Sequence, residues 1–184
     1  MTYRFFRWIA GIMLHWFYSD IQVVGASNIP GRGGMLIAVN HPNAMVDALI
    51  GAWIMPRRVT LTAKATLMSN PIVAMLFNLV GVVPLRRSRD EGPLGSASAI
   101  TERNQGAFRE IIAVLGQSGA VLIFPEGTTH SNPELAPLKT GLARIALRAR
   151  DEGVKNLNIV PIGLSFEEKG QPGTRVPWHV WACA

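Results

Sequence analysis

The stretch MLIAVNHPNAMVDALIGAWIM, residues 35–55, predicts how this chain folds. Residues 35–39 are apolar and follow two glycines, which is typical of a short buried strand. The apolar run at the end of the stretch is typical of a helix, with Pro42 suited to its first turn and Asn43 as a candidate cap. His41 is therefore expected at the carboxyl end of a strand, on the turn into a helix. That edge is where open α/β sheets bind ligands.

His41 and Asp47 are the candidate catalytic pair on this turn. Histidine accepts a proton near neutral pH, and a carboxylate on its other ring nitrogen holds it in one tautomer. Residues six apart do not share a face of a straight helix. The pair therefore requires His41 before the helix and Asp47 in its first turns, where side chains lean back toward the amino end. A polar turn with Asn43 as its cap is the alternative interpretation.

Three further stretches follow His41 and Asp47 in a fixed order. They are GVVPLRR (81–87), FPEGT (124–128), which follows an apolar run over 120–123, and Val160-Pro161-Ile162. Together these four boxes resemble the glycerol-phosphate and lysophospholipid acyltransferase family, the 1-acylglycerol-3-phosphate acyltransferase-like group. Four boxes in the family's order are more specific than any one of them.

The chain departs from the family pattern at three places. Five residues separate His41 from Asp47 where most relatives have four, although a subset of bacterial relatives is similar. Pro84 stands at the aromatic position of the second box, and Thr129 stands where an arginine usually follows FPEGT. These departures affect the expected substrate contacts more than the expected base.

The resemblance implies a single α/β domain of the glycerol-3-phosphate acyltransferase-like type, with a mostly parallel central sheet flanked by helices. It implies an O-acyltransferase that moves a fatty acyl group from an acyl thioester to a hydroxyl of a lysophospholipid, in phospholipid biosynthesis. The donor would be acyl-coenzyme A or acyl carrier protein, and no cofactor or metal is needed. His41, oriented by Asp47, would deprotonate the acceptor hydroxyl.

Cationic side chains are the candidates for binding the phosphate of the acceptor. Arg87 matches the arginine of the family's second box, and Arg86 precedes it. Guanidinium groups bind phosphate oxygens in a bidentate fork. Lys139 is a candidate for the cation that Thr129 does not supply.

The FPEGT box contributes the other expected substrate contacts. By resemblance, Glu126 helps to bind the glycerol-phosphate acceptor. Gly127 allows the backbone to come close to a ligand, and backbone amides with the Thr128 hydroxyl can hold phosphate oxygens. His130 is a second candidate base, but we expect no suitably placed carboxylate beside it, and the resemblance favours His41.

Composition restricts the class of protein. The chain has 184 residues, enough for one domain with a good core, and 48% of them are hydrophobic. Its formal charge of +6 suits an anionic membrane surface or a phosphorylated substrate. No nucleic-acid motif is present. Cys183 is the only cysteine, which excludes a disulfide framework, a cysteine-based metal site and a plausible cysteine nucleophile.

Residues 1–18 are expected to form a helix that lies in the membrane interface, ahead of an acyltransferase domain over 19–184. The uninterrupted apolar run Trp8–Leu14 is much shorter than the roughly 20 residues of a spanning helix. The expected location is the cytoplasmic face of a membrane, the bacterial inner membrane. A helix packed on the core of the domain is the alternative.

The rest of the chain gives four weaker expectations. Residues 71–80 predict an apolar helix with Asn70 as its cap, either buried or in contact with lipid. Residues 88–100 predict a long loop, a candidate lid. Residues 158–164 are the last clear strand. After Phe166 the pattern is lost, and the domain is expected to be atypical or truncated there.

Two other functions fit parts of the sequence. An acyl ester or thioester hydrolase would use a Ser-His-Asp triad, but no Gly-x-Ser-x-Gly elbow is present. A lipid-binding relative with an impaired site would keep the fold without the reaction.

Overall fold

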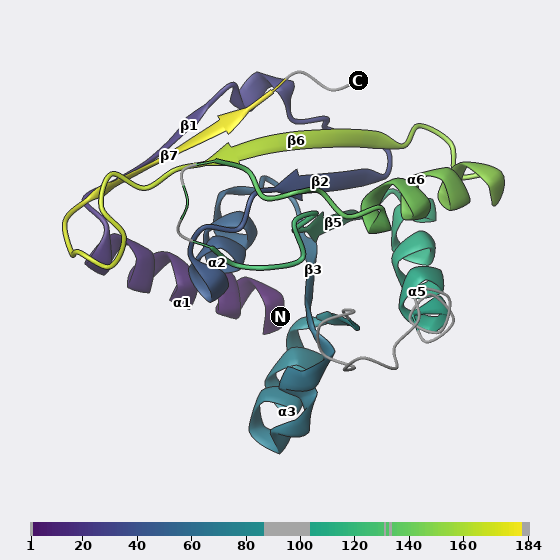
Figure 1. Cartoon of the computed structure of the whole chain (residues 1–184), viewed down its shortest axis with the longest axis horizontal. Helices are drawn as coiled ribbons and strands as arrows, with labels where there is room; N and C mark the ends of the chain where they lie inside the picture. The colour runs from purple at the N-terminus through teal and green to yellow at the C-terminus, as the bar shows by residue number, and fades with distance from the viewer. Residues whose placement is uncertain (1, 87–103, 131, 133, 182–184) are drawn as a thin grey trace.

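A mostly parallel sheet of seven strands forms the centre of the computed structural model, which describes residues 2–86, 104–130, 132 and 134–181 (Figure 1). Across the sheet the strand order is β1-β7-β6-β2-β5-β3-β4. Only the β6–β7 pair of the described strands is antiparallel. The strands are β1 (Asp20–Val24), β2 (Met35–Val39), β3 (Val59–Lys64), β4 (Val83–Leu85), β5 (Ala120–Ile123), β6 (Asn158–Leu164) and β7 (Arg175–Val180).

Helices cover both faces of this sheet, as the resemblance implies (Figure 1). One hydrophobic cluster joins the sheet to α1 and α2, and a second joins it to α5 and α6. The helices are α1 (Thr2–Phe17), α2 (Ala44–Ile54), α3 (Pro71–Val80), α5 (Gln105–Gly116) and α6 (Gly141–Asp151), with short 3₁₀ helices η1 (Ala26–Asn28) and η2 (Ala65–Ser69).

The central strands are apolar on both faces because both faces are covered. In β2, Ile37 lies in the cluster with α2, whereas Leu36 lies in the cluster with α5 and α6. In β5, Leu122 likewise lies in the cluster with α2, and Val121 lies in the cluster with α5 and α6. Successive side chains of a strand point to opposite faces, so a strand between two helical layers reads as a continuous apolar run.

β7 is the element that the sequence pattern did not predict. It lies inside the sheet, parallel to β1 and antiparallel to β6. Val176, Trp178 and Val180 are buried, while Arg175 and His179 are exposed. This alternation is interrupted by Pro177, which lowers the strand signal. The segment after Phe166 therefore contributes a core strand rather than an irregular end.

The two apolar helices α1 and α3 are each buried on one side only. In α1, Ala10 and Leu14 are buried, and the Arg7 Nε donates to the Trp53 carbonyl of α2 at 3.0 Å. The Asn70 side chain caps α3 as predicted, accepting hydrogen bonds from two backbone amides. Of the residues in α3, only Val80 is buried. Both helices consequently present apolar side chains to the outside.

Candidate active site

The turn that carries His41 is held by its neighbours in the sheet. Asn40 follows β2 directly, and its side chain pairs with the backbone of Leu164 at the end of β6. The Asn40 Nδ2 donates to the Leu164 carbonyl at 2.8 Å, and the Leu164 amide donates to Asn40 Oδ1 at 2.7 Å. Ala44, the first residue of α2, has a φ of 44°. A positive φ is unusual for alanine and marks a locally strained turn.

His41 and Asp47 make the contact that their spacing predicted. His41 Nδ1 and Asp47 Oδ2 are 3.0 Å apart, and the backbone amide of Asn43 donates to the same oxygen at 2.7 Å. Asn43 occupies the predicted cap position of α2, but its side chain makes no capping hydrogen bond. With Asp47 as the acceptor, Nδ1 carries the hydrogen and Nε2 remains to accept a proton.

Burial shapes the ionisation of this pair. Asp47 is fully buried and His41 is 7% exposed. Burial raises the pKa of Asp47 above its usual value, and the hydrogen bonds from His41 and Asn43 offset this only in part. The Phe124 ring stacks on the imidazole, with centroids 3.8 Å apart and planes at 21°. The histidine is thus oriented by a carboxylate and confined by an aromatic face.

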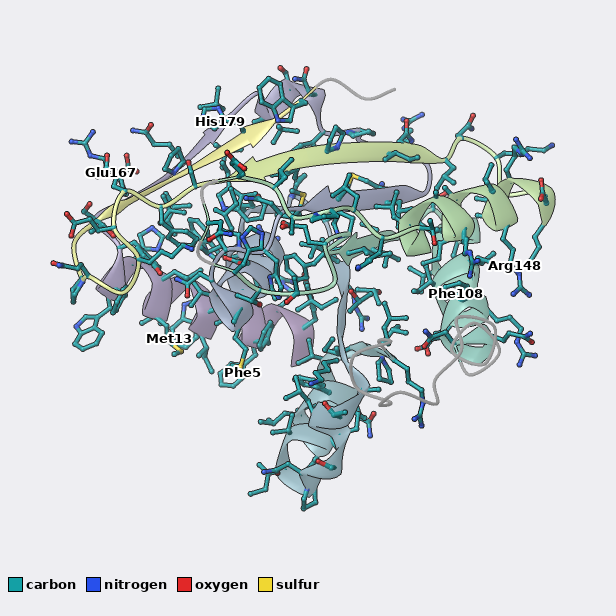
Figure 2. All side chains as sticks on the ribbon, viewed as in Figure 1. Phe5, Met13, Phe108, Arg148, Glu167 and His179 are labelled. Atoms are coloured by element: carbon teal, nitrogen blue, oxygen red, sulfur yellow. The ribbon has the colours of Figure 1, made fainter. Side chains whose placement is uncertain are left out.

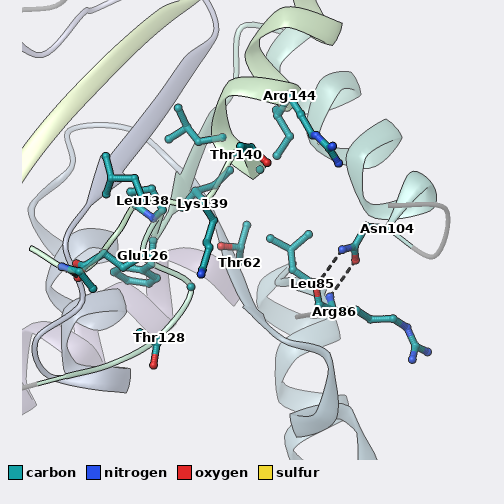
Figure 3. A pocket seen from close by; sticks show the side chains of 18 of the residues that line it. Thr62, Leu85, Arg86, Asn104, Glu126, Thr128, Leu138, Lys139, Thr140 and Arg144 are labelled. Atoms are coloured by element: carbon teal, nitrogen blue, oxygen red, sulfur yellow. Dashed lines mark hydrogen bonds between the residues drawn. The ribbon is translucent and has the colours of Figure 1, made fainter. Parts of the chain in front are cut away.

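A cavity of about 510 Å³ lies at the ends of β3, β4 and β5 and the start of α6 (Figure 3). Phe124 lines it, so one ring contacts both the imidazole and the cavity. His41 itself is not among the lining residues. Three cationic residues line the cavity: Arg86, Lys139 and Arg144. The cavity therefore combines an apolar part with a positively charged part.

Five of the predicted substrate contacts line this same cavity: Arg86, Glu126, Gly127, Thr128 and Lys139. Arg87 lies outside the described residues, as does the predicted loop over 88–100. The structure therefore brings together predicted residues that are up to 53 positions apart in the chain, from Arg86 to Lys139.

Gly127 has a conformation that favours glycine. Its φ is 65°, and an added Cβ would lie 3.4 Å from the Lys139 Cγ. The Lys139 amide donates to the Pro125 carbonyl at 2.7 Å, which ties the lysine to the FPEGT turn. Glycine adopts the left-handed region at no steric cost. The turn and Lys139 are thereby held together at the wall of the cavity.

Glu126 makes contacts that the sequence did not predict. It is 1% exposed, and its Oε1 accepts a hydrogen bond from the His41 amide at 2.9 Å. Its Oε2 accepts from the Ala136 amide at 2.9 Å and from the Nε2 of His130. Burial tends to raise the pKa of Glu126, but the hydrogen bonds from His130, Ala136 and His41 outweigh it, and the pKa is lowered. Both oxygens of the carboxylate are thus engaged within the chain.

The expectation that His130 has no carboxylate beside it was therefore wrong. The turn after β5 brings His130 back onto Glu126, four positions earlier.

Sequence reasoning also missed Asn104, whose side chain exchanges two hydrogen bonds of 2.9 Å with the backbone of Arg86 (Figure 3). Arg144, one turn into α6, was missed as a lining residue. The only sequence signal for Arg144 as a lining residue is its place three residues after Gly141, near the start of a basic helix.

The described residues contain no group of three His, Cys, Asp or Glu side chains that could hold a metal ion. The site therefore consists of an imidazole paired with a buried carboxylate, beside a cavity with cationic residues in its wall.

Comparisons with known proteins show the family to which the chain belongs. A model of the family described as Acyltransferase matches residues 20–165. The 1-acyl-sn-glycerol-3-phosphate acyltransferase of Borreliella burgdorferi is 30% identical over 141 residues, which cover 77% of this chain and 49% of that protein. The enzyme of the same name from Cocos nucifera is 26% identical over 171 residues, covering 93% of this chain and 47% of that protein. The chain thus spans about half the length of these relatives.

A solved structure shares the fold. The crystal structure of the 1-acyl-sn-glycerophosphate acyltransferase of Thermotoga maritima superposes with a TM-score of 0.71 and 21% identity, covering 99% of this chain and 68% of that one. The matched residues 20–165 include both His41 and Asp47 and the whole FPEGT box. The chain therefore belongs to the acyltransferase family.

Proposed function

We propose that this protein is an O-acyltransferase that moves a fatty acyl group from an acyl thioester to a hydroxyl of a lysophospholipid of the 1-acylglycerol-3-phosphate kind, in phospholipid biosynthesis. The observation that carries the proposal is the buried His41–Asp47 pair, 3.0 Å apart, beside a cavity with cationic residues in its wall. The names of the relatives support this class of acceptor.

The chemical step uses the nitrogen of His41 that Asp47 does not engage. Nε2 takes the proton of the acceptor hydroxyl while the hydroxyl oxygen attacks the thioester carbonyl carbon. The tetrahedral intermediate then collapses, the carbon–sulfur bond breaks, and the leaving thiolate takes the proton back from His41. Asp47 stabilises the imidazolium between these two events. No acyl-enzyme forms, and the only products are the acylated lipid and the free thiol.

The acceptor's phosphate belongs, in this proposal, at the cationic wall of the cavity. Lys139, Arg86 and Arg87 remain the proposed phosphate contacts, with Gly127 and Thr128 supplying backbone and hydroxyl donors. Glu126 acts on the acceptor mainly by shaping the turn that carries Gly127, because its carboxylate oxygens already accept three hydrogen bonds within the chain. The thioester donor is acyl-coenzyme A or acyl carrier protein.

The test is a transfer assay on the purified full chain. Labelled acyl-coenzyme A and labelled acyl carrier protein are each incubated with a panel of lysophospholipids. We expect acceptor-dependent transfer that His41→Ala reduces by roughly 10²–10⁴-fold. The matched control is His179→Ala, at an exposed histidine of β7. Release of free fatty acid without transfer would instead favour a hydrolase, and no activity at all would favour a lipid-binding relative.

We also propose that α1 and α3 seat the protein on an anionic membrane surface, at the cytoplasmic face of the bacterial inner membrane. No described helix is long and apolar enough to cross a bilayer. Phe5 and Met13 project from the side of α1 that faces away from the sheet (Figure 2). The large exposed apolar side chains of the two helices are Phe5, Trp8, Ile9, Ile12, Met13 and Trp16 in α1, and Ile72, Met75, Leu76 and Leu79 in α3. α1 and α3 contact each other, so the exposed apolar side chains belong to two neighbouring helices, and such side chains can bind a membrane interface.

Co-sedimentation with phosphatidylglycerol vesicles tests this seat. The double variant Trp8→Ser, Trp16→Ser should lose most of its vesicle binding, because tryptophan anchors at headgroup depth. Trp181→Ser is the matched control, since Trp181 is 60% exposed but lies beyond β7. Equal binding of the two variants would contradict the proposal.

A further inference from the structure

His130 lies two positions beyond the FPEGT box, and no step of the proposed reaction uses it. Its side chain is 20% exposed and its Nε2 pairs with the buried carboxylate of Glu126. Its carbonyl accepts a hydrogen bond from the Lys169 Nζ at 3.3 Å. A histidine bound at both its backbone and its side chain is held in one orientation.

The direction of the His130–Glu126 hydrogen bond follows from the carboxylate. The pKa of Glu126 is lowered, so at neutral pH the group is ionised and can only accept. The Nε2 of His130 must therefore carry the hydrogen. The Nδ1 of His130 is buried and has no hydrogen-bond partner among the described residues, so Nε2 is the ring nitrogen that anchors the side chain.

The other oxygen of the same carboxylate reaches the catalytic turn. Glu126 Oε1 accepts from the His41 amide at 2.9 Å, while Oε2 accepts from His130 and from the Ala136 amide. A carboxylate is planar, so holding Oε2 also determines where Oε1 lies. His130, 89 positions further along the chain, thereby helps to fix the backbone of His41 through Glu126.

We propose that His130 is a positioning residue for the acyl transfer, acting through Glu126 on the backbone of His41. The inference rests on the proposed function, because it gives His130 its part in the same reaction. His130 is not itself the base in this arrangement: Nε2 is occupied by Glu126, and Nδ1 is buried. Small displacements of a catalytic group, on the order of 1 Å, cost about 100-fold in rate.

Two variants that differ by one methylene group test this role. In His130→Gln the side-chain nitrogen reaches about as far as Nε2 and can still donate to Glu126, whereas in His130→Asn it is too short. We expect kcat of His130→Asn to fall about tenfold or more, with the acceptor KM within about twofold of the native value. His130→Gln should stay within about threefold of the native protein. His179→Asn is the matched control.

Hydrogen exchange of the His41 backbone amide, measured by NMR, gives a readout independent of activity. This amide should exchange about tenfold faster in His130→Asn than in the native protein and in His130→Gln. In a Glu126→Gln background, His130→Asn should add little further change, since the two residues act in series.

Three results would overturn the proposal. One is an unchanged His41 amide in His130→Asn, another is a His130→Gln variant as impaired as His130→Asn, and the third is a raised acceptor KM at unchanged kcat. If the native protein transfers no acyl group, the proposed function fails, but the exchange rates still decide whether His130 holds the turn of His41.

Discussion

Two pairs of histidine and carboxylate lie side by side at one edge of the sheet, and they differ in what they do. In the first, Asp47 orients the ring of His41. In the second, His130 donates to Glu126, which binds the backbone of His41. In the proposed reaction the first pair presents a base to a substrate, while the second supports the turn on which that base lies.

The number and placement of donors explain why the two carboxylates ionise differently. Both donors to Asp47 converge on Oδ2, and its Oδ1 is buried without a hydrogen-bond partner among the described residues. Burial therefore dominates, and the pKa of Asp47 is raised. Glu126 has three donors spread over both oxygens, and its pKa is lowered. Burial disfavours the charged form of a carboxylate, whereas hydrogen bonds donated to it favour that form.

The largest expected effect comes from Asp47→Asn. An amide at this position favours the other tautomer of His41, with the hydrogen on Nε2, so the ring can no longer accept the acceptor's proton. Transfer should fall by roughly 10³–10⁴-fold in kcat. A loss smaller than tenfold would show that Asp47 does not orient the base.

Asp47→Asn should also change how the stability of the protein depends on pH. Because the pKa of Asp47 is raised, the folded protein holds this proton more tightly than the unfolded chain does, and the native protein loses stability as pH rises through and above the usual value of 3.8. Asp47→Asn lacks that loss. The Tm of Asp47→Asn minus the Tm of the native protein should therefore be more positive at pH 7 than near pH 4. Thermal denaturation of both proteins at the two pH values measures this difference.

Glu126→Gln should have the opposite dependence on pH. The lowered pKa of Glu126 contributes stability above its usual value of 4.5, and this contribution is lost as pH falls through the lowered pKa. Replacing a buried carboxylate that accepts three hydrogen bonds should cost about 1–3 kcal/mol in the free energy of unfolding at pH 7. This difference in the free energy of unfolding between the native protein and Glu126→Gln, measured by urea denaturation, should become smaller as the pH is lowered. A difference that does not change with pH would mean that the charge of Glu126 does not contribute to stability.

Phe124→Leu is the smallest of these changes. Leucine keeps the apolar lining of the cavity but removes the ring that stacks on His41 at 3.8 Å. Aromatic contacts of this kind are worth about 0.5–1.5 kcal/mol, so kcat should fall about 2- to 12-fold. The melting temperature is the control, because a fall in Tm with kcat unchanged would assign Phe124 to the core alone.

Local pattern predicted the elements that build the site and their order. The apolar run of β2, the turn with His41 and the start of α2 are all determined by residues near one another in the chain, and the His41–Asp47 contact spans only six positions. The cap of α3 by Asn70 is local in the same way. Interactions within one or two turns leave a residue pattern that can be read directly.

Other features left no such pattern. β7 is a short strand interrupted by Pro177, and only its pairing with β1 and β6 places Trp178 in the core. The Asn104 side chain resembles any polar residue before a helix, and only the fold brings it to the backbone of Arg86, 18 positions earlier.

By itself the sequence determined the fold class, the contact between His41 and Asp47, and the family, because each depends on residue types at short and regular spacing. Only the tertiary structure decided that Glu126 binds the His41 backbone and that His130 donates to it. The contact between Glu126 and His41 joins residues 85 positions apart. Which donors reach a buried carboxylate depends on how strands from distant parts of the chain are aligned in the sheet. That alignment results from packing the whole core, and no local pattern records it.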